Sequence, residues 1–244
     1  MVKILIISSC TKTKAIKHSK QPTCKDLTTK SDKERFRQKL PEGSCKAREM
    51  YLGVQHKNIL KAITILRRLA EVVDFYILSA GFGFVEEEEI IPVYDCSFTK
   101  MGKQMIRTRA NQLKIENDFS KIIRTKNYDL IYLALGKDYL EALPNWQTEV
   151  NTLTVAFSPS LNPKVISLAA NSKTVAKLSK QGFTIHGAVG IKGDILRIFA
   201  ENLQQHSHPN EKLQTILRRR ENLERYFENE LFQQRQQSFA NFLP

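Results

Sequence analysis

The residues best able to do chemistry lie directly after the first apolar segment of the chain. Residues 3–9 read KILIISS, and Ser9 is followed by Cys10 and by two lysines, Lys12 and Lys14. The thiolate is the nucleophilic form of cysteine, and neighbouring ammonium groups favour it. We therefore predict that Cys10 is catalytic and that Ser9, Lys12 and Lys14 bind substrate, with the lysines holding a phosphate. The alternative is that Cys10 is only a small buried residue at a strand end.

Two further groups of candidate residues follow apolar segments. The first group comes at the end of the predicted strand 74–79 and consists of Ser79, Gly81 and Gly83. The second group is Tyr94 with Asp95, after a short loop that contains proline. Because the carboxyl ends of parallel strands meet at one edge of a sheet, we expect both groups to lie near Cys10. There Asp95 can act as an acid or base or anchor a ligand, and Tyr94 can stack on a nucleobase. A simple turn or capping role is the alternative for Asp95.

Strand and helix patterns alternate along the chain, which is typical of a parallel sheet with helical crossovers. The apolar runs predict strands over residues 3–8, 74–79, 130–135, 150–157 and 183–186. Helical spacing of apolar residues predicts helices over 47–69, 100–125, 138–143, 165–178 and 195–203. We expect an α/β fold, a mostly parallel sheet flanked by helices, in one domain over 1–204. A C-terminal helical extension follows over 205–244, with a helix over 213–242 that docks on the core or on a second copy.

The charge of the chain points to a polyanionic partner. The sequence has 38 basic and 25 acidic residues, a net charge of +13. Twelve basic and four acidic residues fall between positions 11 and 48, so this segment carries 12 − 4 = +8. We read residues 11–46 as a basic insertion, a mobile arm over the strand ends that engages the phosphates of a nucleotide, tRNA or DNA. The alternative is a solvated loop that keeps the protein soluble.

Several classes of protein are disfavoured. The longest apolar runs are about 6 to 8 residues, well short of the roughly 20 that span a bilayer, and no secretory signal is apparent. We expect a cytoplasmic protein. The four cysteines lack CxxC spacing, which argues against disulfides and a zinc site. Glu86 to Glu89 are consecutive and alternate in direction, so they do not form the converging carboxylates of a two-metal nuclease. We expect neither a metal nor another cofactor.

The segment GAVGIKGD, residues 187–194, is a weaker candidate for binding. A glycine-flanked loop that opens a helix can bind phosphate on its free amide groups. The spacing here is neither that of a Walker loop nor GxGxxG. We favour close packing of the following helix as the reason for these glycines.

Several motifs together resemble a little-characterised domain family of bacteria and phages. Its members carry patterns of the type SCSKTK, ARELYxG, ILSAKYGL and PYD. The corresponding segments here are SSCTKTK, KAREMYLG, FYILSAGFGFV and IIPVYDCSF, with a later GIKGDILRIF. The resemblance covers residues 3–143 and 187–203. That family in turn is similar, more distantly, to the core domain of archaeosine synthase, which is related to the tRNA-guanine transglycosylases.

The resemblance implies an α/β domain that acts on nucleotides or modified nucleobases. Carried over position by position, it implicates Cys10, Lys12, Lys14, Arg48, Tyr51, Gly53, Ser79, Gly81, Gly83, Tyr94 and Asp95. The core domain of archaeosine synthase joins an amine to the nitrile of a deazaguanine, so the resemblance implies an analogous adduct at Cys10. Three departures are present. Lys17-His18 only loosely matches a histidine-containing stretch, the basic insertion separates the first two motifs, and Gly81-Phe82 replaces Lys-Tyr.

Two functions from different classes therefore remain open. The first is a nucleobase- or nucleotide-directed enzyme in tRNA or DNA modification, such as a transferase or an enzyme that forms an amide or amidine. In it Cys10 is the nucleophile, Asp95 the acid or base, and Arg48 grips an anion. The second is a binding module without catalysis, for example in phage defence or a mobile element. The two differ in whether Cys10 or the basic residues between 12 and 48 are essential.

Overall fold

A six-stranded sheet forms the centre of the protein, of which a computed structural model describes residues 2–99 and 101–230. Its strands are β1 (Lys3–Ser9), β3 (Val72–Ser79), β4 (Gly83–Glu86), β6 (Leu130–Ala134), β7 (Thr154–Ala156) and β8 (Val165–Ser167). Their order is β4-β3-β1-β6-β7-β8, and every neighbouring pair is parallel except β3 with β4. A separate antiparallel pair joins β2 (Ser44–Lys46) and β5 (Ile90–Pro92). The predicted α/β class with a mostly parallel sheet is confirmed.

Strand β1 lies at the centre of the sheet because its side chains are apolar on both faces. Ile4, Leu5, Ile6 and Ile7 are all fully buried. A strand that is covered on both faces reads as a continuous apolar run, as KILII does here. Its two parallel neighbours, β3 and β6, pair with it along most of its length.

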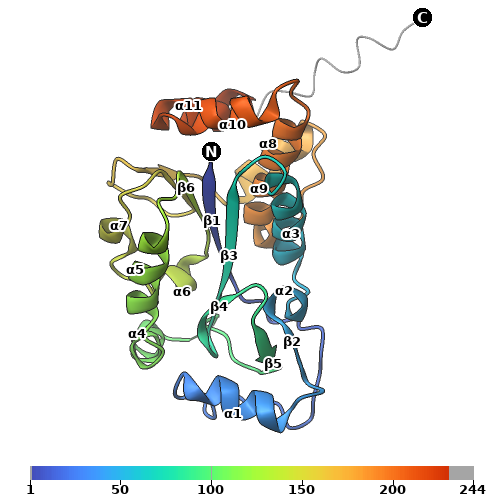
Figure 1. Cartoon of the computed structure of the whole chain (residues 1–244), viewed down its shortest axis with the longest axis vertical. Coiled ribbons are helices and arrows are strands. Elements are labelled where there is room, and N and C mark those ends of the chain that lie inside the picture. The colour runs from blue at the N-terminus through green and yellow to red at the C-terminus, as the bar shows by residue number, and fades with distance from the viewer. Residues whose placement is uncertain (1, 100, 231–244) are drawn as a thin grey trace, which may run out of the picture.

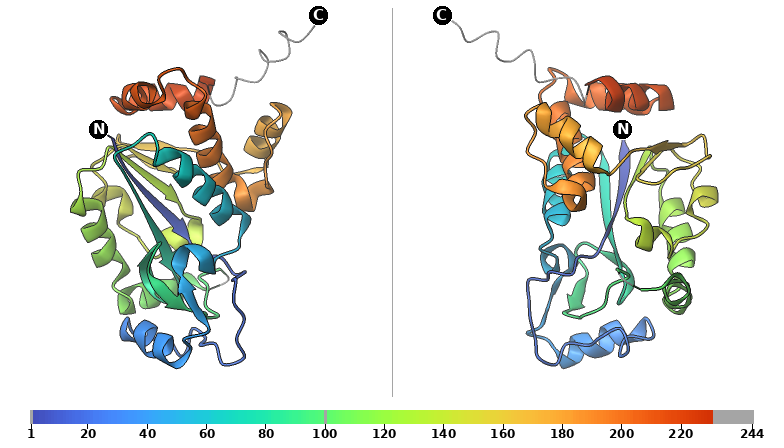
Figure 2. Two further views of the ribbon diagram at one scale, coloured as in Figure 1. Left: turned by 45° about the vertical axis from the view of Figure 1, so that its right-hand side comes forward. Right: turned by 180° about the vertical axis from the view of Figure 1, so that it is seen from behind.

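Helices cover both faces of the sheet and make three layers (Figure 1). One face carries α3 (Val54–Leu66) and α9 (Gly187–Gln204), which pack against each other. The other carries α4 (Lys103–Gln112), α5 (Ile115–Thr125), α6 (Lys137–Leu140) and α7 (Trp146–Glu149), and Figure 2 shows the two layers from other sides. None of the helices within the described residues is long and apolar enough to cross a membrane.

The order of the strands in the sheet, compared with their order in the sequence, indicates where a ligand can bind. From β1 the chain passes through α2 (Ala47–Met50) and α3 to β3 on one side, and later returns to β6 on the other side of β1. The parallel strands thus follow the 2-1-3-4-5 order of doubly wound sheets, with a topological switch point between β1 and β6. Open sheets of this type bind ligands outside the carboxyl ends of the strands at this point.

The basic insertion and the C-terminal extension lie at opposite ends of the sheet (Figure 1). The insertion contains α1 (Ser31–Lys39), which lies beyond the carboxyl ends of β1 and β3. The extension lies beyond the amino ends and consists of α10 (Pro209–Leu217), α11 (Arg220–Arg225) and a π-helical turn η1 (Tyr226–Glu230). Phe199 of α9 packs against the rings of Tyr226 and Phe227 at 5.4 and 5.7 Å. The extension therefore docks on the core, away from the switch point.

The structure corrects several predicted elements in the last third of the chain. Val165–Ser167 forms strand β8 rather than the start of a helix, and the helix α8 spans only Ser172–Lys180, capped by the Asn171 side chain. The predicted strand 183–186 is not a strand. A short apolar run fits either a strand or a helix by pattern. For Val165–Ser167, pairing with β7 makes it a strand. The predicted helix 213–242 is interrupted after Leu217, and its part beyond residue 230 lies outside the described residues.

Candidate functional site

Cys10 lies at the carboxyl end of β1, where its sulfur contacts a tyrosine from the segment that follows the neighbouring strand β6. The Cys10 amide donates to the Leu78 carbonyl at 3.0 Å, so the residue continues the pairing of β1 with β3. Its Sγ lies 3.0 Å from the hydroxyl of Tyr139, which is on α6 directly after β6. Only 6% of Cys10 is exposed. The thiol is thus fixed at the switch point between β1 and β6.

Tyr139 is held as a neutral phenol. Burial is the main cause that raises its pKa, and the neighbouring Cys10 adds to the shift. Its ring also packs edge-on against Phe98, with 5.2 Å between the ring centroids. The hydroxyl lies within reach of both the Cys10 sulfur and the Cys10 carbonyl, at 3.0 and 3.3 Å. Tyr139 can therefore donate a hydrogen bond to a thiolate at Cys10.

A chain of three buried hydroxyl groups lies beside this pair. The Ser79 hydroxyl donates to the Tyr94 hydroxyl at 2.8 Å, and the Tyr94 and Tyr51 hydroxyls lie 2.9 Å apart. Ser79 is oriented by the amides of Gly81 and Phe82, which donate to its oxygen at 3.0 and 3.1 Å. Burial raises the pKa of both tyrosines well above the usual value. These neutral phenols form a polar wall.

Lys14 reaches this wall from the basic insertion. Its ammonium lies 4.2 Å from the centre of the Tyr94 ring and donates to the Thr11 carbonyl at 3.3 Å. A short backbone bridge to Tyr51 fixes its position. Burial lowers the pKa of Lys14, while the charges of Cys10 and Asp95 act in the opposite direction. A lysine with a lowered pKa is better suited to donate or accept a proton than a solvated one.

Two of the predicted glycines are required by close contacts at the site. A Cβ at Gly81 would lie 2.8 Å from the Tyr94 ring, and a Cβ at Gly53 would lie 2.5 Å from the Thr11 methyl group. Gly83 has a φ of +73° and begins β4. The glycine at position 81 therefore makes room for the Tyr94 ring.

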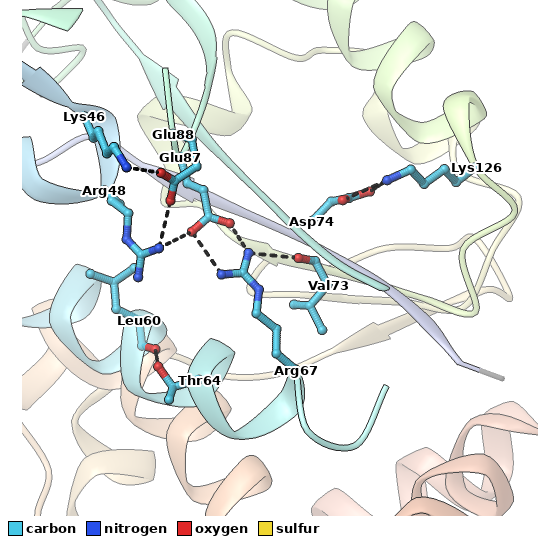
Figure 3. Close-up of polar contacts among 10 residues, drawn as sticks. All are labelled: Lys46, Arg48, Leu60, Thr64, Arg67, Val73, Asp74, Glu87, Glu88 and Lys126. Carbon is cyan, nitrogen blue, oxygen red and sulfur yellow. Dashed lines mark hydrogen bonds and ion pairs between the residues drawn. The ribbon is translucent and has the colours of Figure 1, made fainter. Parts of the chain in front are cut away.

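The residues just described form a cluster around the thiol: Cys10, Lys14, Tyr51, Ser79, Tyr94 and Tyr139. The structure places other predicted residues apart from this cluster. Figure 3 shows that Arg48 binds the acidic run, with its NH1 2.8 Å from Glu88 and 3.4 Å from Glu87. Glu87 is buried and also pairs with Arg67, which in addition donates to the Val73 carbonyl at 3.1 Å. Arg48 thus neutralises carboxylates of its own chain.

The remaining predicted residues lie at the edge of the cluster. Ser9 precedes Cys10, and successive side chains of a strand point to opposite faces, so Ser9 faces away from the thiol. Lys12 is exposed. Asp95 is also exposed, although its backbone pairs with the insertion through an amide bond to the Pro22 carbonyl at 2.8 Å.

The basic insertion is held against the body of the protein by residues that the sequence analysis missed. The buried guanidinium of Arg109 donates to the carbonyls of Ala80, Cys24 and Leu27, the last two at 2.9 and 2.7 Å. Cys24 forms a disulfide with Cys96. The prediction that the cysteines form no disulfide is therefore wrong. The spacing of the cysteines could not reveal this bond, because it depends on how the insertion folds back.

Half of the basic residues between positions 11 and 48 are neutralised within the protein. Six of the twelve form ion pairs with carboxylates: Lys30, Lys33, Arg35, Arg37, Lys46 and Arg48. The exposed lysines without an ion pair to any described residue are Lys12, Lys17, Lys20, Lys25 and Lys39. The charge that remains for a partner is thus smaller than composition indicates.

The glycines of GAVGIKGD pack α9 against α3. A Cβ at Gly193 would lie 2.4 Å from the Gln55 carbonyl oxygen. The fully buried Asp194 of the same segment accepts from Asn58 at 2.8 Å and from the amide and ring of His186, both at 2.8 Å. Close packing, with α3 as the partner, accounts for this motif.

Fold and site together define a doubly wound α/β protein with a thiol, an ammonium group and neutral phenols at its switch point. Within this class, the chain belongs to the family of unknown function DUF6884, which matches residues 36–159. The match includes the motifs around Arg48, Ser79 and Tyr94, and it begins after Cys10 and Lys14. No curated protein and no solved structure matches the chain. The more distant resemblance to archaeosine synthase therefore rests on the motifs alone.

Proposed function

We propose that this protein is a nucleobase- or nucleotide-directed enzyme of tRNA or DNA modification, with Cys10 as its nucleophile. The observation that carries the proposal is the position of the Cys10 sulfur. It lies at the switch point of the sheet, 3.0 Å from the Tyr139 hydroxyl and within the electrostatic range of the half-buried Lys14. Strand ends at a switch point are where doubly wound enzymes bind substrates.

The groups around Cys10 suit addition of a thiol to an electrophilic carbon. As the new C–S bond forms, the π electrons of a C–N multiple bond move to the nitrogen, and the proton lost from the thiol is delivered there. Lys14 accepts this proton from the thiol and passes it to the nitrogen, a role that suits it because burial lowers its pKa. Tyr139 can donate a hydrogen bond to the thiolate, and the paired hydroxyls of Tyr94 and Tyr51 offer further polar contacts to a substrate. An amine that then displaces the thiol would give the amidine of a modified base.

A binding module without catalysis is the second candidate, and one observation favours it. Only 6% of Cys10 is exposed, so a substrate reaches the thiol only after the cluster opens. The exposed lysines of the insertion, such as Lys12, Lys17 and Lys20, would then supply phosphate contacts with a strong salt dependence. In this case substitution of Cys10 leaves function intact, and substitution of these lysines abolishes it.

Intact-mass measurement decides between the two functions. Wild type, Cys10→Ser and Cys45→Ser are each incubated with nucleotides, deazaguanines, tRNA and duplex DNA, with thermal stability measured on the same mixtures. Cys45 is the matched control, since it is the second free cysteine and burial raises the pKa of its thiol. An adduct on wild type and Cys45→Ser that Cys10→Ser lacks supports the enzyme. Equal stabilisation of all three proteins without an adduct rejects the nucleophile and supports the binding module.

A further inference from the structure

A second site lies at the carboxyl ends of β6 and β7, next to the switch point. A cavity of about 530 Å³ opens there, which is a size typical of small-molecule sites. It is lined by Arg107 of α4, by residues of α6 and the turn that follows, and by Phe157 and Ser158 after β7. It is thus built from the strand ends that bind ligands in doubly wound sheets.

Helix α6 separates this cavity from Cys10. Lys137, Leu140 and Glu141 line the cavity and are spaced three and four residues apart, so they share one face of the helix. Tyr139, on the other side of the same turn, contacts the Cys10 sulfur. The cavity and the thiol cluster are therefore two sites joined by one short helix.

The cavity carries unneutralised positive charge. Arg107 pairs with Glu141 through its Nε and NH2 groups, both 2.7 Å from the same carboxylate oxygen, and its NH1 group is left for a ligand. Lys137 is exposed and has no ion pair with any residue that the structure describes. This arrangement suits an anionic group.

Part of the cavity lining is apolar and fixed in position. The Phe157 ring meets Tyr132 edge-on, with 5.8 Å between the centroids. Tyr132 is itself held, because its hydroxyl donates to the Lys192 carbonyl at 2.6 Å. Together with Leu140, the Phe157 side chain offers a surface on which a flat ring can pack.

We propose that this cavity binds a nucleoside 5′-monophosphate, free or as one unit of a nucleic-acid strand. Its base packs on Phe157 and Leu140, and its phosphate lies between Lys137 and the NH1 group of Arg107. An inorganic anion would leave the apolar wall unfilled, and an apolar ligand would leave the charges unpaired. The inference rests on the proposed function in one respect, since it takes nucleotides as the substrate class.

Isothermal titration tests the cavity directly. The probes are the four common nucleoside 5′-monophosphates, the corresponding nucleosides, inorganic phosphate, and five-residue single strands of DNA and RNA. We expect a monophosphate or a strand to bind the full chain, and nucleosides and phosphate to bind at least about tenfold more weakly, because each lacks half of the contacts. Tighter binding of the monophosphate identifies a free nucleotide as ligand, and tighter binding of the strand identifies a unit within it.

Variants locate the ligand. Lys137→Gln and Phe157→Leu should each weaken binding about tenfold, while Lys61→Gln, an exposed lysine on α3 across the sheet, should bind as wild type does. Thermal unfolding of each variant confirms that it is folded. Absence of binding to wild type, or binding that neither Lys137→Gln nor Phe157→Leu weakens, overturns the proposal, as does phosphate that binds as tightly as the nucleotide.

The same titration with Cys10→Ser separates the two proposals. We expect this variant to bind the nucleotide as wild type does, because α6 lies between the thiol and the cavity. If no adduct forms at Cys10 but Lys137→Gln loses nucleotide binding, the cavity stands and the proposed catalytic function falls. If instead an adduct forms at Cys10 in wild type and equally in Lys137→Gln, but wild type does not bind the nucleotide at the cavity, the proposed catalytic function stands and the cavity proposal falls.

Discussion

The hydroxyl of Tyr139 lies 3.0 Å from the sulfur of Cys10, although 129 positions separate the two residues in the chain. The contact exists because β1 and β6 are neighbours, paired in parallel from Ile4 with Leu130 to Ser8 with Ala134. Residues that follow the two strands therefore meet at the switch point. The thiol consequently has a buried hydroxyl group as its hydrogen-bond partner.

Substitution Tyr139→Phe should slow the alkylation of Cys10. The variant keeps the buried ring but removes the hydroxyl beside the sulfur, and loss of a hydrogen bond to the charged nucleophile should slow the reaction about tenfold. The rate is measured with iodoacetamide, with the Cys10 and Cys45 peptides resolved by mass. Tyr128→Phe, which loses a hydrogen bond to Asp74 elsewhere, should leave the rate unchanged. An unaltered or faster rate in Tyr139→Phe would exclude the proposed role of its hydroxyl.

Substitution Lys14→Met should change how stability depends on pH. Burial holds the folded-state pKa of Lys14 below the unfolded value of 10.5, so between these values the unfolded chain binds more protons. Stability then rises with pH in this window, by at most about 1.4 kcal/mol per pH unit. The free energy of unfolding of wild type minus that of Lys14→Met should therefore increase toward alkaline pH.

Urea unfolding at several pH values up to 10.5 measures this difference for Lys14→Met. The second lysine with a lowered pKa, Lys192, is present in both proteins and cancels in the subtraction. Lys61→Met, at an exposed position, is the control and should show no such slope. A difference that falls as the pH rises would mean that the Lys14 ammonium is stabilised rather than desolvated.

The central sheet was predictable because its signals are local. The apolar run from Ile4 to Ile7 is typical of a strand buried on both faces, and such a strand brings the polar residues that follow it, Cys10 among them, to the carboxyl edge of the sheet. The same rule applies to β6 and would have found Tyr139, which follows Gly136 by three residues. The contact of Cys10 with Tyr139 was therefore within reach of the sequence.

Other contacts depend on tertiary folding and have no local signal. Arg48 has the spacing of a motif residue, yet its partners Glu87 and Glu88 are brought to it by the turn after β4. Arg109 looks like an ordinary helical arginine, because its three carbonyl partners come from segments 29 to 85 residues away. Val165–Ser167 became a strand because the edge of β7 was free to pair.

The disulfide between Cys24 and Cys96 should be detectable by counting thiols. Of the four cysteines, Cys10 and Cys45 are free, so alkylation of the denatured protein should modify two positions without reductant and four with it. The bond closes a loop of 72 residues, so reduction should lower the free energy of unfolding by about 4 kcal/mol. Four alkylated positions without reductant would show that the two sulfurs are not bonded.

Arg109 should be required to hold the basic insertion against the carboxyl ends of the strands. In Arg109→Leu the carbonyls of Ala80, Cys24 and Leu27 lose a charged donor, and we expect the free energy of unfolding to fall by at least about 3 kcal/mol. Because Lys14 reaches the Cys10 cluster from this segment, its release should also expose the thiol. Faster proteolysis between residues 12 and 40, together with faster alkylation of Cys10, measures that release.

Two variants separate anchoring by Arg109 from a general effect of losing charge. Arg109→Lys keeps the charge but cannot reach three carbonyls at once, so it should behave as Arg109→Leu does, to a smaller extent. Arg68→Leu, at an exposed position after α3, should match wild type in proteolysis and alkylation. If Arg109→Leu lost stability while residues 12–40 stayed protected, the insertion would be held by its disulfide and apolar contacts instead, since Leu27 is fully buried.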